Sequence, residues 1–311
     1  MELIEDIDRI AAPLTNAVVT IGNFDGVHLG HQALFRKVIE KARLLDGKSV
    51  AITFEPHPVR VLKQNGLPPL ITIYEQKIEL IARTGMDVLI CIQFTPEFAA
   101  LSPQAFVVDL LVNRIGMKAI VVGDDYTFGK NREGNLELLQ AYARQFDFEV
   151  ITVGEIQTAN SIAQRISSTK IRDLVMEGDV DIARRLLGRN YQVRGVVVSG
   201  RNRGGRQLGF PTANIQLEDE LCPKNGIYAV TVEYGNQSYP GVANIGYSPT
   251  FGDQQFTVEV YLIGFSGDLY GKHLRVNFVR RLRDEKRFAD LTALSAQIKQ
   301  DVMDARKILA D

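Results

Sequence analysis

The hydrophobic pattern of this 311-residue chain changes character near Gln192. Before that point, short apolar runs alternate with stretches of helical spacing, which is typical of βαβ units around a mostly parallel, doubly wound sheet. From Gln192 onward, short strands follow one another through Gly, Pro and Asn turns, as in an antiparallel barrel or sandwich. One layered architecture does not hold both patterns, so we predict two domains, residues 1–187 and 188–311.

The same pattern places individual elements. A final segment puts Leu291, Leu294, Ile298 and Val302 on one helical face, and we expect this helix to pack on the barrel. A charged helical connection is expected at 170–187, ahead of the domain boundary. In the first domain we expect strands at 18–21, 50–54, 88–94, 119–122 and 150–153 and helices at 34–45, 75–83, 103–115 and 136–146; in the second, strands at 193–199, 227–234, 238–244, 257–265 and 274–282.

Charge and composition narrow the classes of partner. The chain has 36 Lys and Arg against 37 Asp and Glu, so no global basic field attracts nucleic acid or an anionic membrane. Two cysteines, Cys91 and Cys222, are too few for a disulfide framework or a zinc site. The acidic start, MELIEDIDRI, lacks the apolar core of a signal peptide, and no apolar stretch has the length of a membrane span. We therefore expect a soluble protein of the reducing cytoplasm.

A glycine-rich turn, GNFDGVHLGH at 22–31, follows the first expected strand and precedes a helix. Its glycines allow close approach to a bulky anion, and the helix offers free N–H groups at its positive end. His28 and His31 are three residues apart, so both can project to one side and donate to phosphate oxygens. The alternative is a turn with two incidental histidines. A metal site is disfavoured because no third ligand has suitable spacing.

Two further segments could contact the phosphate groups that the glycine-rich turn is expected to bind. In RISSTKIR, at 165–172, Ser168 or Thr169 can cap a helix, and Arg172 follows one turn later. Alone, this pattern is equally typical of a capped helix with solvated charges. In FEPHP, two prolines hold His57 just beyond the expected strand at 50–54, although a surface-loop histidine fits this pattern as well.

Together, GNFDGVHLGH and SSTKIR resemble the HxGH nucleotidylyltransferase superfamily. The resemblance implies a doubly wound α/β fold that transfers a nucleoside monophosphate from a triphosphate to an acceptor. An acceptor phosphate is already ionised at pH 7, so positioning and charge stabilisation suffice without a general base. On this resemblance, the residues expected at phosphate or nucleotide are His28, His31, Arg165, Ser168, Arg172, Gly22, Asn23, Phe24, Gly30, His57 and Thr169, with Asp125 on the acceptor side.

The second half contains its own constellation. The loop GRNRGGRQLG, at 200–209, could wrap phosphates with backbone N–H groups and guanidinium groups, or be an exposed hairpin loop. In the following PTAN, Thr212 and Asn214 point to the same side if extended and offer hard oxygen ligands for Mg²⁺, or form a polar edge. Glu259 lies on the polar face of the alternating strand 257–262, as a solvated residue or as a base in a cavity.

These segments, with PKNGIY at 223–228, NIG at 244–246, PTF at 249–251 and VEV at 258–260, resemble the riboflavin kinase family. The resemblance implies a six-stranded β-barrel with a terminal helix, in which Glu259 activates the ribityl hydroxyl and Thr212 and Asn214 contact Mg²⁺ and phosphates. It assigns ATP to Gly200, Arg201, Gly204, Arg206 and Gly209, and flavin to Tyr228, Asn244, Thr250 and Arg283.

Both resemblances in this order identify the chain as a member of the bifunctional prokaryotic riboflavin kinase/FMN adenylyltransferase (FAD synthetase) family. The implied reactions are phosphorylation of riboflavin to FMN and adenylylation of FMN to FAD, with ATP as co-substrate. The sequence departs from the family at Ser248 and Tyr261, where Arg and His are usual, and these positions bear on flavin affinity or kinase rate. Rival hypotheses are an adenylyltransferase for another acceptor, such as a pantetheine or nicotinate nucleotide, and a flavin-binding module without catalysis.

Overall fold

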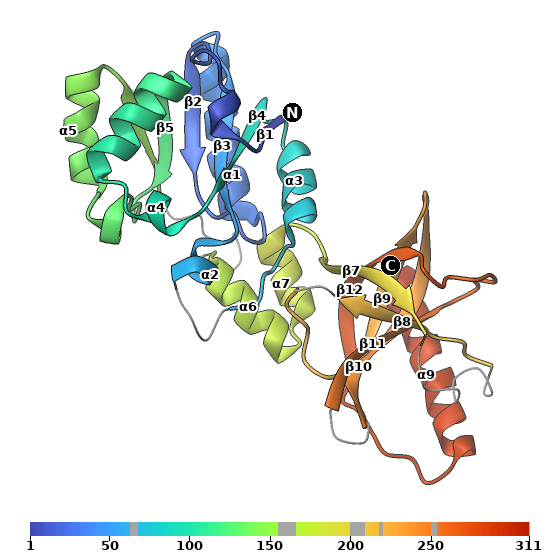
Figure 1. The fold of residues 1–311 in the computed structure, drawn as a ribbon. Helices are drawn as coiled ribbons and strands as arrows, with labels where there is room; N and C mark the ends of the chain where they lie inside the picture. Colours follow the sequence, from blue (N-terminus) through green and yellow to red (C-terminus); the bar gives the residue numbers. More distant parts are fainter. Residues whose placement is uncertain (63–67, 155–165, 200–208, 218–219, 250–253, 311) are drawn as a thin grey trace. The chain divides into compact units, whose positions relative to one another are not determined.

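The computed structural model describes residues 1–62, 68–154, 166–199, 209–217, 220–249 and 254–310. It divides into two compact units, Met1–Ser167 and Ser168–Asp311 (Figure 1). Among the described residues, none of the helices combines the length and the hydropathy that a membrane span requires.

The first unit is built on a six-stranded parallel sheet in the order β1-β4-β3-β2-β5-β6 (Figure 1). Strand order reverses at β2, because β3 pairs with one of its edges and β5 with the other. Ligands of such sheets bind beyond the carboxyl ends of the strands at this switch point. The strands are β1 (Glu2–Ile4), β2 (Ala17–Ile21), β3 (Ser49–Glu55), β4 (Val88–Gln93), β5 (Met117–Gly123) and β6 (Glu149–Val153).

Helices cover both faces of this sheet, so its strands read as continuous apolar runs. Val19 and Ile120 belong to the core on one face, and Val18 and Val121 belong to the core on the other. The helical elements are η1 (Ile7–Arg9), α1 (Leu29–Leu44), α2 (Pro58–Leu62), α3 (Tyr74–Ala82), α4 (Pro96–Ala99), the π-helix η2 (Ala105–Ile115), η3 (Lys130–Arg132) and α5 (Leu136–Phe146).

The second unit opens with two helices, α6 (Ser168–Glu177) and α7 (Val180–Leu187), and continues as a closed antiparallel barrel. Around the barrel the strands run β10-β11-β8-β7-β12-β9, and β9 pairs back to β10. The terminal helix α9 (Leu291–Ala310) packs on β9, β10 and β12. The strands are β7 (Tyr191–Val198), β8 (Ala213–Leu217), β9 (Gly226–Tyr234), β10 (Gln237–Pro249), β11 (Gln254–Leu262) and β12 (His273–Arg283).

The predicted fold class is confirmed: a parallel α/β unit, then a six-stranded barrel with a terminal helix. The strand pattern did not predict β1, because three residues are too short to show a period, or β8, whose sequence ANIQL follows directly on a polar motif. The helix predicted at 103–115 is present from Ala105, wound as a π-helix.

Candidate active sites

The turn after β2 lies at the switch point of the parallel sheet, and its shape is set by packing around Phe24. This residue adopts a positive φ of 47°, and its ring is 2% exposed and packs edge-on against His31 and Phe35. A Cβ on Gly22 would lie 2.8 Å from the Phe24 ring, so glycine is required there. The half-buried Asn23 accepts a hydrogen bond from the Thr53 hydroxyl through its backbone oxygen. Packing and this hydrogen bond therefore hold the turn in its conformation.

His28 and His31 form one unit at the start of α1. His28 is the N-cap, and its Nδ1 accepts the backbone N–H of His31 at 3.3 Å. In the neutral ring the proton then lies on Nε2, which can donate to an anion. The two rings stack with centroids 3.6 Å apart, and the His28 ring is 3.1 Å from the Cβ position of Gly30. His28 thus offers a donor at the start of a helix, where phosphate binds readily, and the His31 ring lies stacked beside it.

Asp25, to which the sequence analysis assigned no role, holds this turn through hydrogen bonds to a segment distant in the sequence. Its buried carboxylate accepts the backbone N–H groups of Ile71 and Thr72 at 3.1 Å and the Thr72 hydroxyl at 3.3 Å. The Gly26 N–H donates to the Thr72 hydroxyl at 3.0 Å. Asp25 therefore links the turn to the segment before α3. In the sequence, the position of Asp25 within the glycine-rich turn is the feature that could have indicated this role.

His57 and Asp125 follow the ends of other strands in this unit. His57 is 6% exposed, and its Nδ1 accepts the N–H of Val59 at the start of α2, so it is buried and capping rather than on the surface. Asp125 is exposed just beyond β5, on the other side of the switch point.

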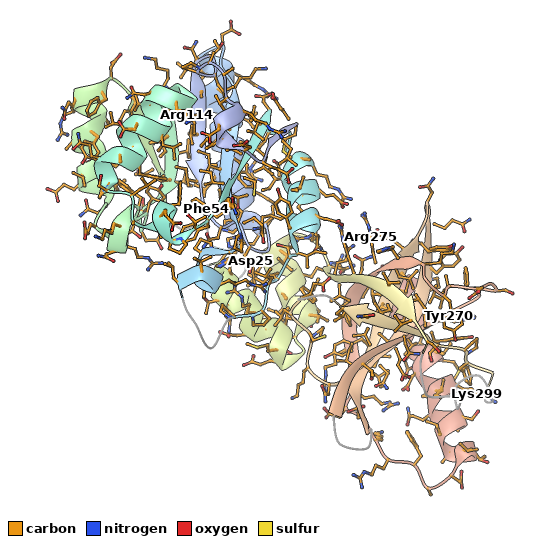
Figure 2. All side chains as sticks on the ribbon, in the orientation of Figure 1. Asp25, Phe54, Arg114, Tyr270, Arg275 and Lys299 are labelled. Carbon is orange, nitrogen blue, oxygen red and sulfur yellow. The ribbon has the colours of Figure 1, made fainter. Side chains whose placement is uncertain are left out.

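A row of aromatic rings, missed in the sequence, runs along the same end of the sheet. Phe54 is the last but one residue of β3, and Figure 2 places it with Asp25 near this end. Adjacent ring centroids are 5.5 Å apart for Phe54 and Phe94 and 5.6 Å for Tyr126 and Phe128. Such rings can pack against a planar heteroaromatic ligand. The row comprises Phe54, Phe94, Phe98, Phe106, Phe128 and Tyr126.

The RISSTKIR motif spans the junction of the two compact units. Ile166 is buried in the first unit, and its backbone oxygen lies 3.9 Å from the Cβ position of Gly30. Ser168 begins α6 in the second unit; Ser168 and Arg172 are half-buried, and Thr169 is exposed. Arg165 lies outside the described residues.

In the barrel, Glu259 lies between two amide side chains. It pairs with Asn214 of β8 on one side and with Asn244 of β10 on the other. Cross-strand partners share a face, and because Val258 and Val260 fill the barrel core, all three polar residues are on the outer face. Glu259 and Asn244 line a cavity of about 470 Å³. Its other lining residues are Phe210, Thr212, Ile227, Val242, Tyr261, Arg283, Glu285, Lys286, Phe288, Leu294, Ile298 and Asp301.

A second cavity, of about 800 Å³, meets the first at Thr212. Thr212 lines both cavities, and Asn214 lines the second. A nucleotide in one cavity and an acceptor in the other would therefore meet beside Thr212, Asn214 and Glu259. The second cavity is further lined by Val197, Ser199, Pro211, Ala213, Leu262, Phe265, Ser266, Gly267, Asp268, Leu269 and Tyr270.

The oxygen atoms near Thr212 suit a hard cation shared with phosphates. No group of three or more His, Cys, Asp or Glu that could hold a metal occurs among the described residues. The hydroxyl of Thr212, directly before β8, and the amide of Asn214, on β8, instead fit an ion that keeps most of its ligands from phosphate and water, as Mg²⁺ does.

Of the predicted flavin residues in the barrel that the structure describes, Asn244 and Arg283 line the first cavity and Tyr228 does not. Asn244 lines the first cavity, and its Oδ1 is buried with no partner among the described residues. Arg283 lines the same cavity and is paired with Asp301, which the sequence analysis missed. Tyr228 is fully buried and is not among the lining residues. Tyr261, one of the two family departures, packs edge-on against Phe210 at the cavity wall.

Most of the predicted ATP residues of the barrel, and one predicted flavin residue, lie outside the described residues. Gly209 is described and exposed, at the end of the glycine-basic loop. The remaining predicted residues of this loop and of the PTF motif, Gly200, Arg201, Gly204, Arg206 and Thr250, lie outside the described residues.

A parallel α/β unit with a glycine turn and two histidines at its switch point, followed by a barrel with an acid in one of two adjoining cavities, is typical of a two-site nucleotide-dependent transferase. Comparison with known families agrees. The FAD synthetase family model matches residues 11–170, and the riboflavin kinase model matches residues 187–309. The chain belongs to the bifunctional riboflavin kinase/FMN adenylyltransferase family, as predicted.

Relatives with this name match the chain from end to end. One from Escherichia coli (strain K12) is 39% identical over 309 residues, covering 99% of this chain and 97% of the relative. One from Pseudomonas fluorescens is 39% identical over 311 residues, covering 100% and 98%. A crystal structure described as a macrolide-efflux protein from Streptococcus pneumoniae has a TM-score of 0.88 at 34% identity, covering 98% of both chains. That description concerns the other protein; the likeness supports the fold.

Proposed function

We propose that this chain makes FAD from riboflavin in two ATP-dependent steps. The barrel phosphorylates riboflavin to FMN, and the α/β unit transfers AMP from ATP to FMN with release of pyrophosphate. The observation that carries the proposal is that the two units carry unlike groups, a carboxylate, Glu259, in a cavity of the barrel and two stacked histidines, His28 and His31, at the start of α1. Each site fits the chemistry of one acceptor, an alcohol or an ionised phosphate.

In the kinase step, the acceptor is a ribityl hydroxyl, which is a poor nucleophile while it holds its proton. Glu259 takes that proton as the hydroxyl oxygen attacks the γ-phosphorus of ATP, and ADP leaves. Asn214 and Asn244 flank Glu259 and orient its carboxylate. Thr212 and Asn214 would hold Mg²⁺, which neutralises charge on the phosphates when bound.

The flavin and the nucleotide of this step occupy the two cavities that meet at Thr212. Asn244 presents an unsatisfied buried carbonyl oxygen to the smaller cavity, where it can accept from a flavin N–H. Arg283, which lines the same cavity, is a further proposed flavin residue. We retain Tyr228 and Thr250 as proposed flavin residues, and Gly200, Arg201, Gly204, Arg206 and Gly209 as proposed ATP residues, on the family motif.

In the adenylyl transfer, a phosphate oxygen of FMN attacks the α-phosphorus of ATP, and pyrophosphate leaves. No base is required, because this oxygen is already ionised. His28 and His31 stabilise charge on the phosphates, and Ser168 and Arg172 extend that role. The proposed nucleotide positions are Gly22, Asn23, Phe24, Gly30, His57 and Thr169, with Arg165 at the phosphates. We place the isoalloxazine ring against the aromatic row, on the side of Asp125.

We further propose that the substrates are small molecules of the cytoplasm and that the chain acts as a monomer or weak homo-oligomer. Separate incubations of the protein with riboflavin and with FMN, each with MgATP, test both steps by chromatography of the products. We expect FMN and FAD in the first incubation and FAD with pyrophosphate in the second. Adenylylation of phosphopantetheine or nicotinate mononucleotide in preference to FMN would contradict the acceptor assignment.

A further inference from the structure

A β-bulge interrupts the pairing of β12 with β9 at Leu282. Arg281 lies opposite Tyr228. The next pair is Arg283 with Ile227, so the register passes over Leu282. In an unbroken antiparallel ladder, Leu282 would lie opposite Ile227. The bulge therefore places an arginine beside Ile227 where regular pairing would place a leucine.

The residue beside Ile227 belongs to the polar face of the kinase cavity. Ile227 is opposite Asn244 of β10, and Asn244 is opposite Glu259 of β11. Cross-strand partners share a face, so Arg283 continues a row of residues that runs across three other strands to the proposed base. All four members of this row line the cavity of about 470 Å³. A leucine at the Arg283 place in the row would offer no cation to the buried Asp301 carboxylate.

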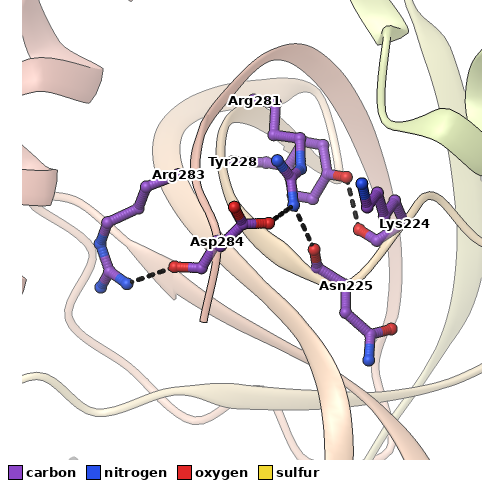
Figure 3. Close-up of polar contacts among 6 residues, drawn as sticks. All are labelled: Lys224, Asn225, Tyr228, Arg281, Arg283 and Asp284. Carbon is purple, nitrogen blue, oxygen red and sulfur yellow. Dashed lines mark hydrogen bonds and ion pairs between the residues drawn. The ribbon is translucent and has the colours of Figure 1, made fainter. Parts of the chain in front are cut away.

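Arg281 lies beside Tyr228 and binds the chain on both sides of the bulge (Figure 3). Its Nη2 donates to the backbone oxygen of Asn225, ahead of β9, at 2.6 Å and to Asp284 Oδ1, beyond the bulge, at 2.6 Å. Arg283 Nη1 donates to the backbone oxygen of Asp284 at 2.8 Å. Asp284 therefore links the two arginines, because its side chain accepts from Arg281 and its backbone accepts from Arg283.

Packing restricts where the Arg281 side chain can lie. Its guanidinium is 6.0 Å from the centre of the Tyr228 ring, which is fully buried and whose hydroxyl donates to the Lys224 oxygen. A Cβ on Gly226 would lie 2.8 Å from Arg281 Nη2. A Cβ on Gly178, in the turn between α6 and α7, would lie 2.7 Å from Arg281 Cδ. The side chain is therefore confined, and its hydrogen bonds hold the bulge in one geometry.

We infer that Arg281 is a positioning residue for riboflavin phosphorylation, because it holds the β12 bulge that brings Arg283 into the row with Glu259. The inference rests on the proposed kinase function and on the proposed place of Arg283 at the flavin. These residues all belong to one compact unit, Ser168–Asp311. Arg281 is not among the described residues that line the cavity, so it acts on riboflavin through Arg283.

The kinetics of FMN formation from riboflavin and MgATP test the inference in full-length variants. Arg281→Met removes the charge and the hydrogen bonds, and Arg281→Lys keeps the charge. Asp284→Asn weakens the same link at an exposed side chain, where a substitution has little effect on stability. The double variant Arg281→Met/Arg283→Met asks whether the effect passes through Arg283. Arg280→Met is the matched control, because Arg280 is the exposed neighbour on the same strand.

We expect Arg281→Met to raise the KM for riboflavin about tenfold, the scale on which loss of one hydrogen bond to a charged group weakens binding. The KM for ATP should change less than about twofold, because none of the described residues that line the second cavity is on β12. Asp284→Asn should raise the riboflavin KM about threefold, as expected for an exposed ion pair. Arg281→Lys should restore part of the loss, and Arg280→Met should match the wild type. Added to Arg283→Met, Arg281→Met should raise the riboflavin KM less than about twofold further.

Three results would overturn the inference. A riboflavin KM in Arg281→Met within about twofold of the wild type would show that the bulge does not depend on this arginine. A lower kcat with both KM values unchanged would show that Arg281 only stabilises the fold, because unfolding removes active enzyme without altering the remainder. A further rise of about tenfold on adding Arg281→Met to Arg283→Met would show that the effect does not pass through Arg283.

Two comparisons keep the test decisive. Should Arg281→Met fail to fold, an unchanged riboflavin KM in Asp284→Asn overturns the inference equally. If the wild-type chain formed no FMN from riboflavin, the proposed function itself would fall. Normal turnover in the wild type, with the riboflavin KM unchanged in the variants, removes the inference alone.

Discussion

The carboxylate of Asp301, on the terminal helix α9, accepts two hydrogen bonds from the guanidinium of Arg283, on β12. Arg283 Nε is 2.8 Å from Oδ1, and Arg283 Nη2 is 2.6 Å from Oδ2. Asp301 is 4% exposed, and Gln297 donates a further hydrogen bond to it at 2.9 Å. Both members of the ion pair line the cavity that contains Glu259. The terminal helix is therefore fastened to the kinase cavity by a buried, bidentate ion pair.

Asp301→Asn should weaken both the fold and riboflavin binding. It leaves the buried Arg283 charge without its counter-charge, and breaking a buried pair in this way costs about 3 kcal/mol of unfolding free energy. Urea denaturation measures that loss, and the KM for riboflavin should rise. The control is Asp304→Asn, on the same helix, whose pairing with Lys307 at 3.9 Å is exposed and is worth less than about 1 kcal/mol. Equal effects of the two variants would contradict the assignment.

Glu259→Gln should remove the base of the kinase step. The amide keeps the size and hydrogen-bonding capacity of the side chain but cannot take the proton, so we expect riboflavin phosphorylation to fall by about 10²–10⁴-fold. FAD synthesis from supplied FMN should continue at the wild-type rate. Glu233→Gln, on β9 and outside the cavity, is the matched control. Normal riboflavin turnover in Glu259→Gln would refute the role of this carboxylate.

His28→Asn should suppress FAD synthesis while FMN synthesis stays normal. Asparagine retains an acceptor for the start of α1, so the helix cap survives, whereas the Nε2 donor is lost. Loss of one donor to developing charge lowers the rate by about 10²–10³-fold. Pyrophosphate release with FMN and MgATP provides the measurement, and His273→Ala, at an exposed histidine of β12, is the control. A parallel fall in FMN synthesis would argue against two independent sites.

Asp87 should make the stability of the protein depend on pH in acid. Burial alone raises the pKa of Asp87, but hydrogen bonds from the Ser49 hydroxyl at 2.6 Å and backbone N–H at 2.9 Å outweigh burial and lower it. A carboxyl whose pKa is lower in the folded state stabilises the fold above its unfolded pKa of about 3.9, and this contribution is lost as pH falls through the folded value.

The test compares urea unfolding of the wild type and Asp87→Asn at pH 7 and near pH 3. The wild type should be the more stable protein at pH 7, and the difference should shrink at the lower pH. A difference that is the same at both values would show that the ionised form of Asp87 has no special role.

Local pattern was sufficient for much of the fold and for part of each site. Strand β2, the glycine turn and helix α1 follow one another in sequence, so their composition predicts the phosphate turn with His28 and His31. The alternation of Val258, Glu259 and Val260 likewise predicts which face Glu259 occupies. The strand β8 was not predicted, because its polar motif masks the alternation.

Contacts between distant segments could not be predicted in this way. The aromatic row joins residues from β3, the loops after β4 and β5, α4 and η2, and no spacing along the chain relates them. His57 appeared in a loop pattern that fits either an exposed or a buried ring, and only packing shows that it is buried.

The amino-acid order, through local periodicity and contiguous motifs, is enough to establish two domains, the class of each and the motifs that handle phosphate, because these features depend on neighbours along the chain. Only three-dimensional packing decides that Asp25 is held by Thr72, that Arg283 is paired with Asp301 and that the α6–α7 turn rests on Arg281. Such contacts depend on strand register, helix seating and burial, which arise when remote segments exclude water together.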